Sequence, residues 1–136
     1  MDIITKCVEE TIKHLPTELS FTESNYQHCL SYFLSKFGTV ENEVVLSYII
    51  QDGGRKVCIG SGRIDVLFRP HGSNKVFLCE LKISPKAYNI KYFFPQVKRY
   101  CHFYKNQFEE CEGVIIVFSQ FKSQCQHVVD SKLMVY

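Results

Sequence analysis

Two short segments of the chain place charged side chains in apolar or glycine-rich surroundings. Glu80 and Lys82 lie within the apolar stretch 76–83, and Asp65 follows the glycine-rich stretch 60–63. Successive side chains on a strand point to opposite faces of the sheet, so Glu80 and Lys82 are expected on the same face. Burying either charge alone would be costly, which makes this pair a candidate functional site.

Asp65 extends the pair, because its predicted strand and that of Glu80 are neighbours in an antiparallel meander. Two carboxylates that converge in this way, with water in the remaining positions, provide the hard oxygen donors that suit Mg²⁺ or Mn²⁺. Such an ion activates a water molecule, polarises a phosphate and offsets charge on the leaving oxygen. Lys82 would hold that water or stabilise the developing charge. The pattern therefore predicts a metal-dependent nuclease centre.

An ExK triplet also has an ordinary explanation, since it occurs by chance in most proteins and often forms a surface ion pair. The surrounding sequence favours the nuclease centre. The approach to Asp65 is glycine-rich, and apolar residues flank each charge. The segment 81–108 contains six basic residues and no acidic one, which suits a polyanionic partner although the net charge of the chain is only +2.

The elements that must position these residues follow from the apolar periodicity. Helical spacing predicts helices over 2–15, 22–37 and 95–108. Apolar and β-branched runs predict three strands on short turns, 44–50, 57–68 and 75–83, and a buried strand, 113–118, after a crossover helix. The tail is expected to form a short helix and a last strand, 132–136. Together these make one α/β domain over 1–136, with a central mixed sheet flanked by helices.

Glu23 and Gln96 each have a structural interpretation. Ser20, Thr22 and Glu23 fit a capping box, in which the Glu23 side chain closes back on Ser20. Gln96 follows Pro95 at the start of its helix, where a solvated first-turn residue is ordinary.

Aromatic residues alternate with lysines in the basic segment, where they could either stack nucleobases or pack in the core. Tyr100, Tyr104 and Phe108 fit the core stripe of the predicted helix. The other aromatic residues of this segment are Tyr88, Tyr92, Phe93, Phe94 and Phe103. The basic residues left as candidate phosphate contacts are Lys91, Lys98 and Arg99.

The chain has seven cysteines, spread singly and without a CxxC pair. This pattern indicates reduced, buried thiols and gives no sign of a zinc site or a thioredoxin-type redox pair. No segment approaches a membrane span, and the first residues lack the features of a signal peptide. We therefore expect an intracellular, reducing compartment, either cytoplasm or nucleus, and no membrane partner.

Four elements, in the expected order, resemble the PD-(D/E)XK nuclease superfamily. The chain is most similar to the small GxxExxYQ-type proteins and more distantly resembles Holliday junction resolvases and VRR-NUC domains. The matching elements are an ExxYQ helix at 23–27, a glycine-plus-RxD strand at 60–65, an ExK strand at 80–82 and a QxxxY helix at 96–100. Two positions depart from the pattern. Ile64 stands where the superfamily name has proline, and no glycine precedes Glu23 at the expected place.

The resemblance implies a restriction-endonuclease-like αβββαβ core and a Mg²⁺- or Mn²⁺-dependent nuclease, a hydrolase that acts in DNA repair or recombination. The metal ligands it implies are Asp65, Glu80 and the backbone carbonyl of Leu81. The catalytic lysine would be Lys82, and the accessory groups would be Glu23 and Gln96. The expected nucleic-acid contacts are Arg63, Lys91, Lys98 and Arg99.

Two alternatives to a DNA nuclease stay open at this point. One is a non-catalytic nucleic-acid-binding or assembly module that retains the nuclease fold. The other is an RNA endonuclease of the same superfamily, because the catalytic residues do not distinguish the two sugars. The sequence also leaves open the substrate's shape, endo- or exonucleolytic cleavage, and the oligomeric state, with a homodimer or a larger complex among the candidates.

Overall fold

The structure is a computed structural model that describes residues 2–16, 19–84, 90–107, 110–119, 124–129 and 132–135. Its helical elements are α1 (Ile3–His14), α2 (Glu23–Leu34), the 3₁₀ helix η2 (Ile90–Phe93) and α3 (Phe94–Gln107). Its strands are β1 (Gly38–Asp52), β2 (Arg55–Pro70), β3 (Val76–Ser84), β4 (Cys111–Ser119), β5 (Gln124–Val129) and β6 (Lys132–Val135).

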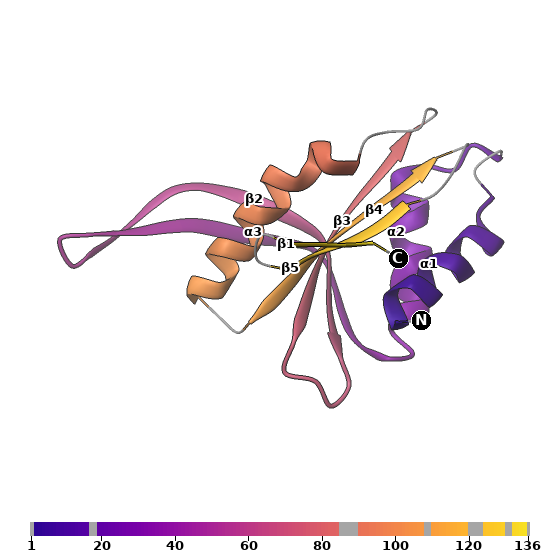
Figure 1. Ribbon diagram of the computed structural model, residues 1–136, viewed down its shortest axis with the longest axis horizontal. Helices are drawn as coiled ribbons and strands as arrows, with labels where there is room; N and C mark the ends of the chain where they lie inside the picture. The colour runs from indigo at the N-terminus through magenta and orange to yellow at the C-terminus, as the bar shows by residue number, and fades with distance from the viewer. Residues whose placement is uncertain are drawn as a thin grey trace.

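The strands form one mixed sheet in the order β1-β2-β3-β4-β5-β6 (Figure 1). Strand β2 is antiparallel to both β1 and β3, as the short turns predicted. Strand β4 is parallel to β3 and follows α3, so the predicted crossover helix and mixed sheet are confirmed. Strands β5 and β6 extend the sheet in antiparallel fashion, which adds to the four central strands expected.

Helices cover both faces of the central strands. On β3, Cys79 and Leu81 pack in the core cluster shared with α1 and α2, whereas Leu78 belongs to the cluster that includes residues of α3. Strand β4 is buried from Val114 to Phe118, because one helical layer lies on each of its faces. This explains why its sequence is continuously apolar rather than alternating.

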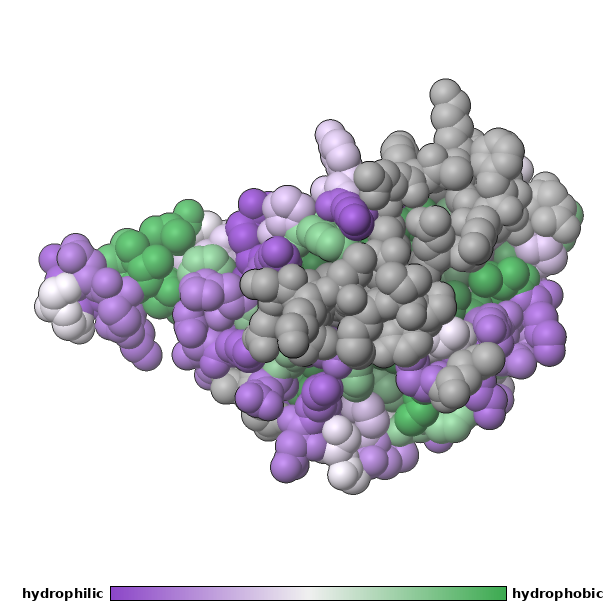
Figure 2. Space-filling model, in the orientation of Figure 1, coloured by the Kyte–Doolittle hydropathy of each residue, from purple (hydrophilic) through white to green (hydrophobic). Residues whose placement is uncertain are grey.

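The β1–β2 hairpin projects beyond the helical layers (Figure 1). Figure 2 shows apolar colouring on this arm. Four large apolar residues of the two strands are exposed: Val45, Ile50, Val57 and Ile59. The two strands pair with each other along almost their whole length, with one irregularity between Tyr48 and Ile49. The base of this hairpin is the part that carries Asp65.

The predicted capping box at the start of α2 is wrong in its partners. The N-cap is Thr22, whose side-chain oxygen accepts from the Asn25 backbone N–H at 3.3 Å. In return, Asn25 Oδ1 accepts from the Thr22 backbone N–H at 2.9 Å. Asn25 therefore takes the reciprocal role that had been given to Glu23, and the Glu23 side chain is not needed for the cap.

The tail also differs from its prediction, because residues 124–129 form a strand rather than a helix. They pair with the outer edge of β4, whose backbone groups would otherwise be open. Strand β6 confirms the expected last strand to within one residue at its end.

Only some of the described cysteines are buried. All six cysteines that the structure describes in detail are free thiols. Cys7, Cys79 and Cys111 are buried, but Cys58 is exposed because it lies on the projecting hairpin, where no helix covers the strands. The side chain of Cys125 lies outside the described residues. Among the described residues, no helix has the length and apolar character needed to span a membrane.

Candidate metal centre

The candidate site forms where β2 and β3 cease to pair. Their ladder joins Val66–Phe68 to Phe77–Cys79 and ends there. Asp65 is the next residue on β2, and its Oδ2 accepts a hydrogen bond from the Leu81 backbone N–H at 2.8 Å. Because the two strands no longer pair at this point, the Leu81 backbone N–H is free to donate to the Asp65 carboxylate instead of to β2. Asp65 and Glu80 are only 6% and 3% exposed.

A cavity of about 500 Å³ opens over these two carboxylates. Its lining comes from α2, β1, β2, β3 and α3: Glu23, Tyr48, Ser61, Gly62, Arg63, Asp65, Glu80, Lys82, Gln96, Arg99 and Tyr100. It therefore brings together three carboxylates, the lysine, the glutamine and two of the arginine candidates of the sequence. A larger cavity, about 760 Å³, lies between the hairpin and α3, and no acidic residue lines it.

Burial makes both carboxylates of the site harder to ionise. Burial, together with the negative charge of Asp65, raises the pKa of Glu80 to about 7. Burial also raises the pKa of Asp65, although the hydrogen bond from the Leu81 N–H opposes the change. In the metal-free protein, this pair holds a proton more readily than free carboxylic acids do.

Lys82 remains a cation in this setting. Burial alone would lower the pKa of Lys82, but the adjacent Glu80 carboxylate, together with Glu23 and Asp65, outweighs burial and raises the pKa above the ordinary lysine value. Lys82 Nζ lies 3.2 Å from Glu80 Oε1 and 5.7 Å from the centre of the Phe93 ring. The lysine can donate hydrogen bonds and stabilise negative charge, but it is poorly suited to accept a proton.

The donor set fits Mg²⁺ or Mn²⁺. Glu80 Oε2 is buried and has no hydrogen-bond partner, the one carboxylate oxygen in this state among the described residues. Within that same part of the chain, no cluster of three or more His, Cys, Asp or Glu side chains is arranged to hold a metal. Two carboxylates with water in the remaining positions are nevertheless the usual protein contribution to a magnesium site. Asp65 and Glu80 supply these two.

Glu23 adds a third acid at the wall of the cavity. Burial and the charge of Asp65 raise the pKa of Glu23, which shows that α2 brings this carboxyl close to the pair. Because Thr22 and Asn25 form the helix cap, the Glu23 side chain is not needed for capping and lines the cavity.

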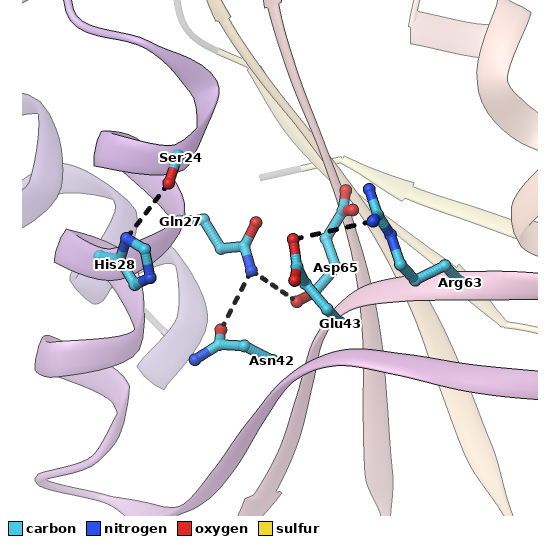
Figure 3. A network of polar contacts seen from close by, with 7 residues as sticks. All are labelled: Ser24, Gln27, His28, Asn42, Glu43, Arg63 and Asp65. Atoms are coloured by element: carbon cyan, nitrogen blue, oxygen red, sulfur yellow. Dashed lines mark hydrogen bonds and ion pairs between the residues drawn. The ribbon is translucent and has the colours of Figure 1, made fainter.

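A polar network holds the backbone of Asp65 from the side of α2 (Figure 3). Gln27 Nε2 donates to the Asp65 carbonyl at 3.2 Å and to Asn42 Oδ1 at 3.4 Å. Ser31 Oγ donates to the same Asn42 oxygen at 2.7 Å. Gln27 is only 7% exposed, so these bonds are shielded from water.

The strand opposite Asp65 is distorted at this point. Glu43 has a left-handed φ of 55°, which is rare and strained for a residue with a side chain. Its neighbours in β1 pair with Ile64 and Val66, but Glu43 and Asp65 do not pair with each other. The hydrogen bond from Gln27 to the Asp65 carbonyl therefore holds the Asp65 backbone at a point where β1 does not pair with it.

Aromatic residues form another wall of the cavity. Tyr48 and Tyr100 pack so closely over Gly62 that a Cβ at this position would collide with both rings. This close approach explains a glycine within the RxD strand. Gln96 Nε2 donates a hydrogen bond to the Tyr100 hydroxyl at 2.7 Å. The Gln96 side chain is therefore part of this wall and is not simply a solvated first-turn residue.

Several expected site residues lie outside the cavity lining or play a different part. The Leu81 side chain is fully buried, and its N–H serves Asp65, while the role of its carbonyl stays a prediction. Lys91 on η2 and Lys98 on α3 are exposed and do not line the cavity. Arg63 does line it, and its Nη1 lies 3.8 Å from Glu43 Oε1.

The sequence did not identify three residues that shape the site. Gln27 was noticed only as part of the ExxYQ match, Tyr100 only as part of the QxxxY match and as a core residue, and Tyr48 was not singled out. The signal for Tyr48 and Tyr100 is Gly62, since a glycine inside a strand indicates close approach of another group. The bond from Gln27 to Asp65 depends on tertiary structure, and no local pattern predicts it.

Comparisons with known proteins establish the fold but not a family. The structure is similar to the solved structure of SSO0001, with a TM-score of 0.61 and 18% sequence identity over 94% of this chain. The likeness covers 59% of that protein's chain, so the present chain spans less than two thirds of its length. No protein-family model matches the sequence, and no curated protein matches it. At this level of identity, the shared property is the α/β architecture.

Proposed function

We propose that this protein is a Mg²⁺- or Mn²⁺-dependent nuclease that hydrolyses phosphodiester bonds, with DNA as its substrate. The observation that carries the proposal is the pair of buried carboxylates, Asp65 and Glu80, with Lys82 at 3.2 Å from Glu80. Two buried acids beside each other are unfavourable in a structural role alone, and the unpartnered Glu80 Oε2 calls for a cation.

A bound divalent cation would polarise the scissile phosphate and offset charge on the leaving oxygen. Asp65 and Glu80 would hold it, and the Leu81 N–H would keep the Asp65 carboxylate in place. Lys82 would donate to the negative charge that develops on the phosphate oxygens. Glu23, with its raised pKa, would orient the attacking water by accepting a hydrogen bond from it.

The rim of the cavity would receive the substrate's backbone. Arg63 and Arg99 line the cavity, and a guanidinium suits the paired oxygens of a phosphate. These contacts would be made to backbone phosphates, which DNA and RNA share. The choice of DNA rests on the sequence resemblance, and an RNA substrate remains the alternative within the same mechanism.

The direct test is a cleavage assay with Mg²⁺, Mn²⁺ or EDTA on single-stranded, duplex, flapped and four-way DNA, and on matched RNA. We expect cleavage by the wild type with either metal, and its loss in EDTA, in Asp65→Ala and in Lys82→Ala. Cleavage that survives both substitutions would refute the assignment. Nucleic-acid binding without cleavage by the wild type would instead favour the non-catalytic module.

A matched control comes from a second Glu–Lys pair in the same molecule, in which the glutamate is buried and the lysine is exposed. Lys75 Nζ lies 3.2 Å from Glu112 Oε2, the same separation as in the site, but neither residue lines the cavity. Lys75→Ala should therefore leave cleavage unchanged. If it abolishes cleavage as Lys82→Ala does, the effect of both substitutions is on folding, and melting curves of the two variants will show it.

A further inference from the structure

Tyr92 on η2 is the most exposed large aromatic or aliphatic residue that the structure describes, with 82% of its surface accessible. The sequence had assigned Tyr100, Tyr104 and Phe108 to the core and had left the other aromatic residues of the basic segment open between base stacking and core packing. Tyr100 and Tyr104 are buried as expected, and Phe103 stacks on Tyr48 with ring centres 4.7 Å apart. Among the aromatic residues of this segment that the structure describes, Tyr92 is the most exposed.

A chain of contacts connects the Tyr92 ring to the candidate metal centre. The ring meets Phe93 edge-on, with centres 6.0 Å apart and planes at 78°. The Phe93 ring in turn lies 5.7 Å from Lys82 Nζ, which is 3.2 Å from Glu80 Oε1. Only one aromatic ring thus separates Tyr92 from the lysine of the site.

The charge around Tyr92 suits a nucleic-acid strand. Lys91 precedes it, and Lys98 and Arg99 are exposed on the helix that follows η2. Arg99 also lines the cavity of the metal centre, so basic groups continue from the Tyr92 side to the site. Exposed aromatic rings among basic residues are the usual means of binding single strands without regard to sequence.

We propose that Tyr92 is the stacking platform for an unpaired base of the substrate strand, adjacent to the phosphate that the metal centre would cleave. Inside a duplex, both faces of each base are covered by neighbouring bases. A protein ring can therefore stack on a base only in a single strand or where the strand is locally unpaired. The substrate class is therefore single-stranded nucleic acid, or the unpaired strand at a flap or junction. This inference rests on the proposed nuclease function.

The first test uses the absence of tryptophan from the chain. Tyr92→Trp introduces a single tryptophan, whose fluorescence should fall on titration with a short oligothymidine, in Ca²⁺ and separately in EDTA. A matched duplex should produce a much smaller change. Unchanged fluorescence, while a labelled oligothymidine shows binding by anisotropy, would overturn the proposal.

Tyr32 provides a matched control, because its surroundings reproduce those of Tyr92 away from the site. It is 61% exposed, lies edge-on to Phe33 with ring centres 5.2 Å apart, and has Lys36 near both rings. It does not line the cavity. The fluorescence of Tyr32→Trp should not respond to oligothymidine beyond the change seen with duplex.

The second test measures affinity. Tyr92→Ala should weaken oligothymidine binding about tenfold, within the range expected for loss of one stacked base, whereas Tyr92→Phe and Tyr32→Ala should bind like the wild type. An oligonucleotide with one abasic position, moved along the strand, should lose affinity for the wild type at one position only. At that position, Tyr92→Ala should show no further loss. Equal loss with both proteins at every position would contradict the stacking contact.

Failure of this inference and failure of the nuclease proposal give different results. Cleavage that depends on Asp65 and Lys82 but is indifferent to Tyr92 and prefers duplex would overturn the stacking platform and leave the nuclease intact. Binding of single strands through Tyr92, without cleavage in Mg²⁺ or Mn²⁺, would support the platform and refute the nuclease. An absence of single-strand binding by the wild type would overturn the platform.

Discussion

The chain contains two Glu–Lys pairs of nearly equal geometry, one at the candidate metal centre and one near the start of β3 and β4. In both pairs the nitrogen and oxygen are 3.2 Å apart, and the glutamate side chain is 4% exposed. They differ in their neighbours. Glu80 has Asp65 beside it and an oxygen without a hydrogen-bond partner, whereas no buried oxygen of Glu112 is in that state.

The comparison shows that an ion pair with a buried glutamate does not by itself indicate a functional site. The pair of Glu112 and Lys75 links the residue before β3 to the adjacent β4 and can be explained as structure. The pair of Glu80 and Lys82 lies where β2 has left β3, so a second carboxylate can approach from the neighbouring strand. What distinguishes the candidate site is thus an excess of buried negative charge, which a cation would relieve.

Substitution of each lysine in turn should produce the largest difference in cleavage between the two pairs. Lys82→Met should reduce kcat by about 10²- to 10³-fold, as is usual when one donor to a developing charge is lost. Lys75→Met should leave kcat within about twofold of the wild type, although it leaves Glu112 buried without its cation and should lower thermal stability. Comparable kcat values for the two variants would break the distinction, and initial rates at saturating substrate measure it.

Gln27 should account for the next largest effect, because it positions Asp65 without touching the substrate. Gln27→Leu should reduce Mn²⁺ affinity and cleavage about 10- to 100-fold, the range observed when a ligand loses its supporting hydrogen bond. A smaller loss is expected for Gln27→Glu at low pH, where a protonated carboxyl can still donate to the Asp65 carbonyl. A purely structural role would instead change stability and leave Mn²⁺ affinity unaltered in calorimetry.

The excess charge at Glu80 should also appear in the pH dependence of stability without metal. The folded protein raises the pKa of Glu80 from 4.5 to about 7, so Glu80 binds its proton more tightly in the folded than in the unfolded state. The stabilisation is fully present below about pH 4.5 and is lost as the pH rises through 7, a change of roughly 3 kcal/mol.

Glu80→Gln lacks this titration, and its free energy of unfolding should exceed that of the wild type increasingly between pH 5 and 8. Urea unfolding at several pH values in EDTA measures the difference. Saturating Mn²⁺ should suppress the fall in the wild type, since the cation competes with the proton. A constant difference across this range would show that burial and the charge of Asp65 do not raise the pKa of Glu80.

Arg99 should show the smallest effect, because it lies at the exposed rim rather than among the buried acids. Arg99→Ala should weaken nucleic-acid binding by a similar factor for every sequence and should reduce the salt dependence of the affinity by about one phosphate contact. Lys13→Ala, which removes a lysine exposed on α1 away from the site, is the control and should leave the salt dependence as it was. Anisotropy titrations at several salt concentrations distinguish the two.

The sequence was sufficient for the parts of the molecule that depend on short-range patterns. Alternation on β3 placed Glu80 and Lys82 on one face, and turn residues gave the meander that brings Asp65 to the adjacent strand. The patterns failed where two local solutions compete. Glu23 and Asn25 both suit a helix cap, and only the choice of Thr22 as N-cap decided between them and left Glu23 for the site.

Other features depend on contacts between distant segments, and no window of sequence contains them. The bond from Gln27 to the Asp65 carbonyl joins α2 to β2, and it matters because Glu43 interrupts the pairing opposite Asp65. The strand at 124–129 arises because the edge of β4 provides a partner. The exposure of Tyr92 depends on how η2 packs against α3 and β4.

The most direct test of the central claim is calorimetric titration of Mn²⁺ into the wild type, Glu80→Gln and Glu112→Gln at pH 8, above the Glu80 pKa of about 7. The account predicts saturable binding by the wild type and by Glu112→Gln, and loss of binding by Glu80→Gln. Equal Mn²⁺ binding by all three proteins, or binding by none of them, would contradict the claim that Asp65 and Glu80 form a metal centre.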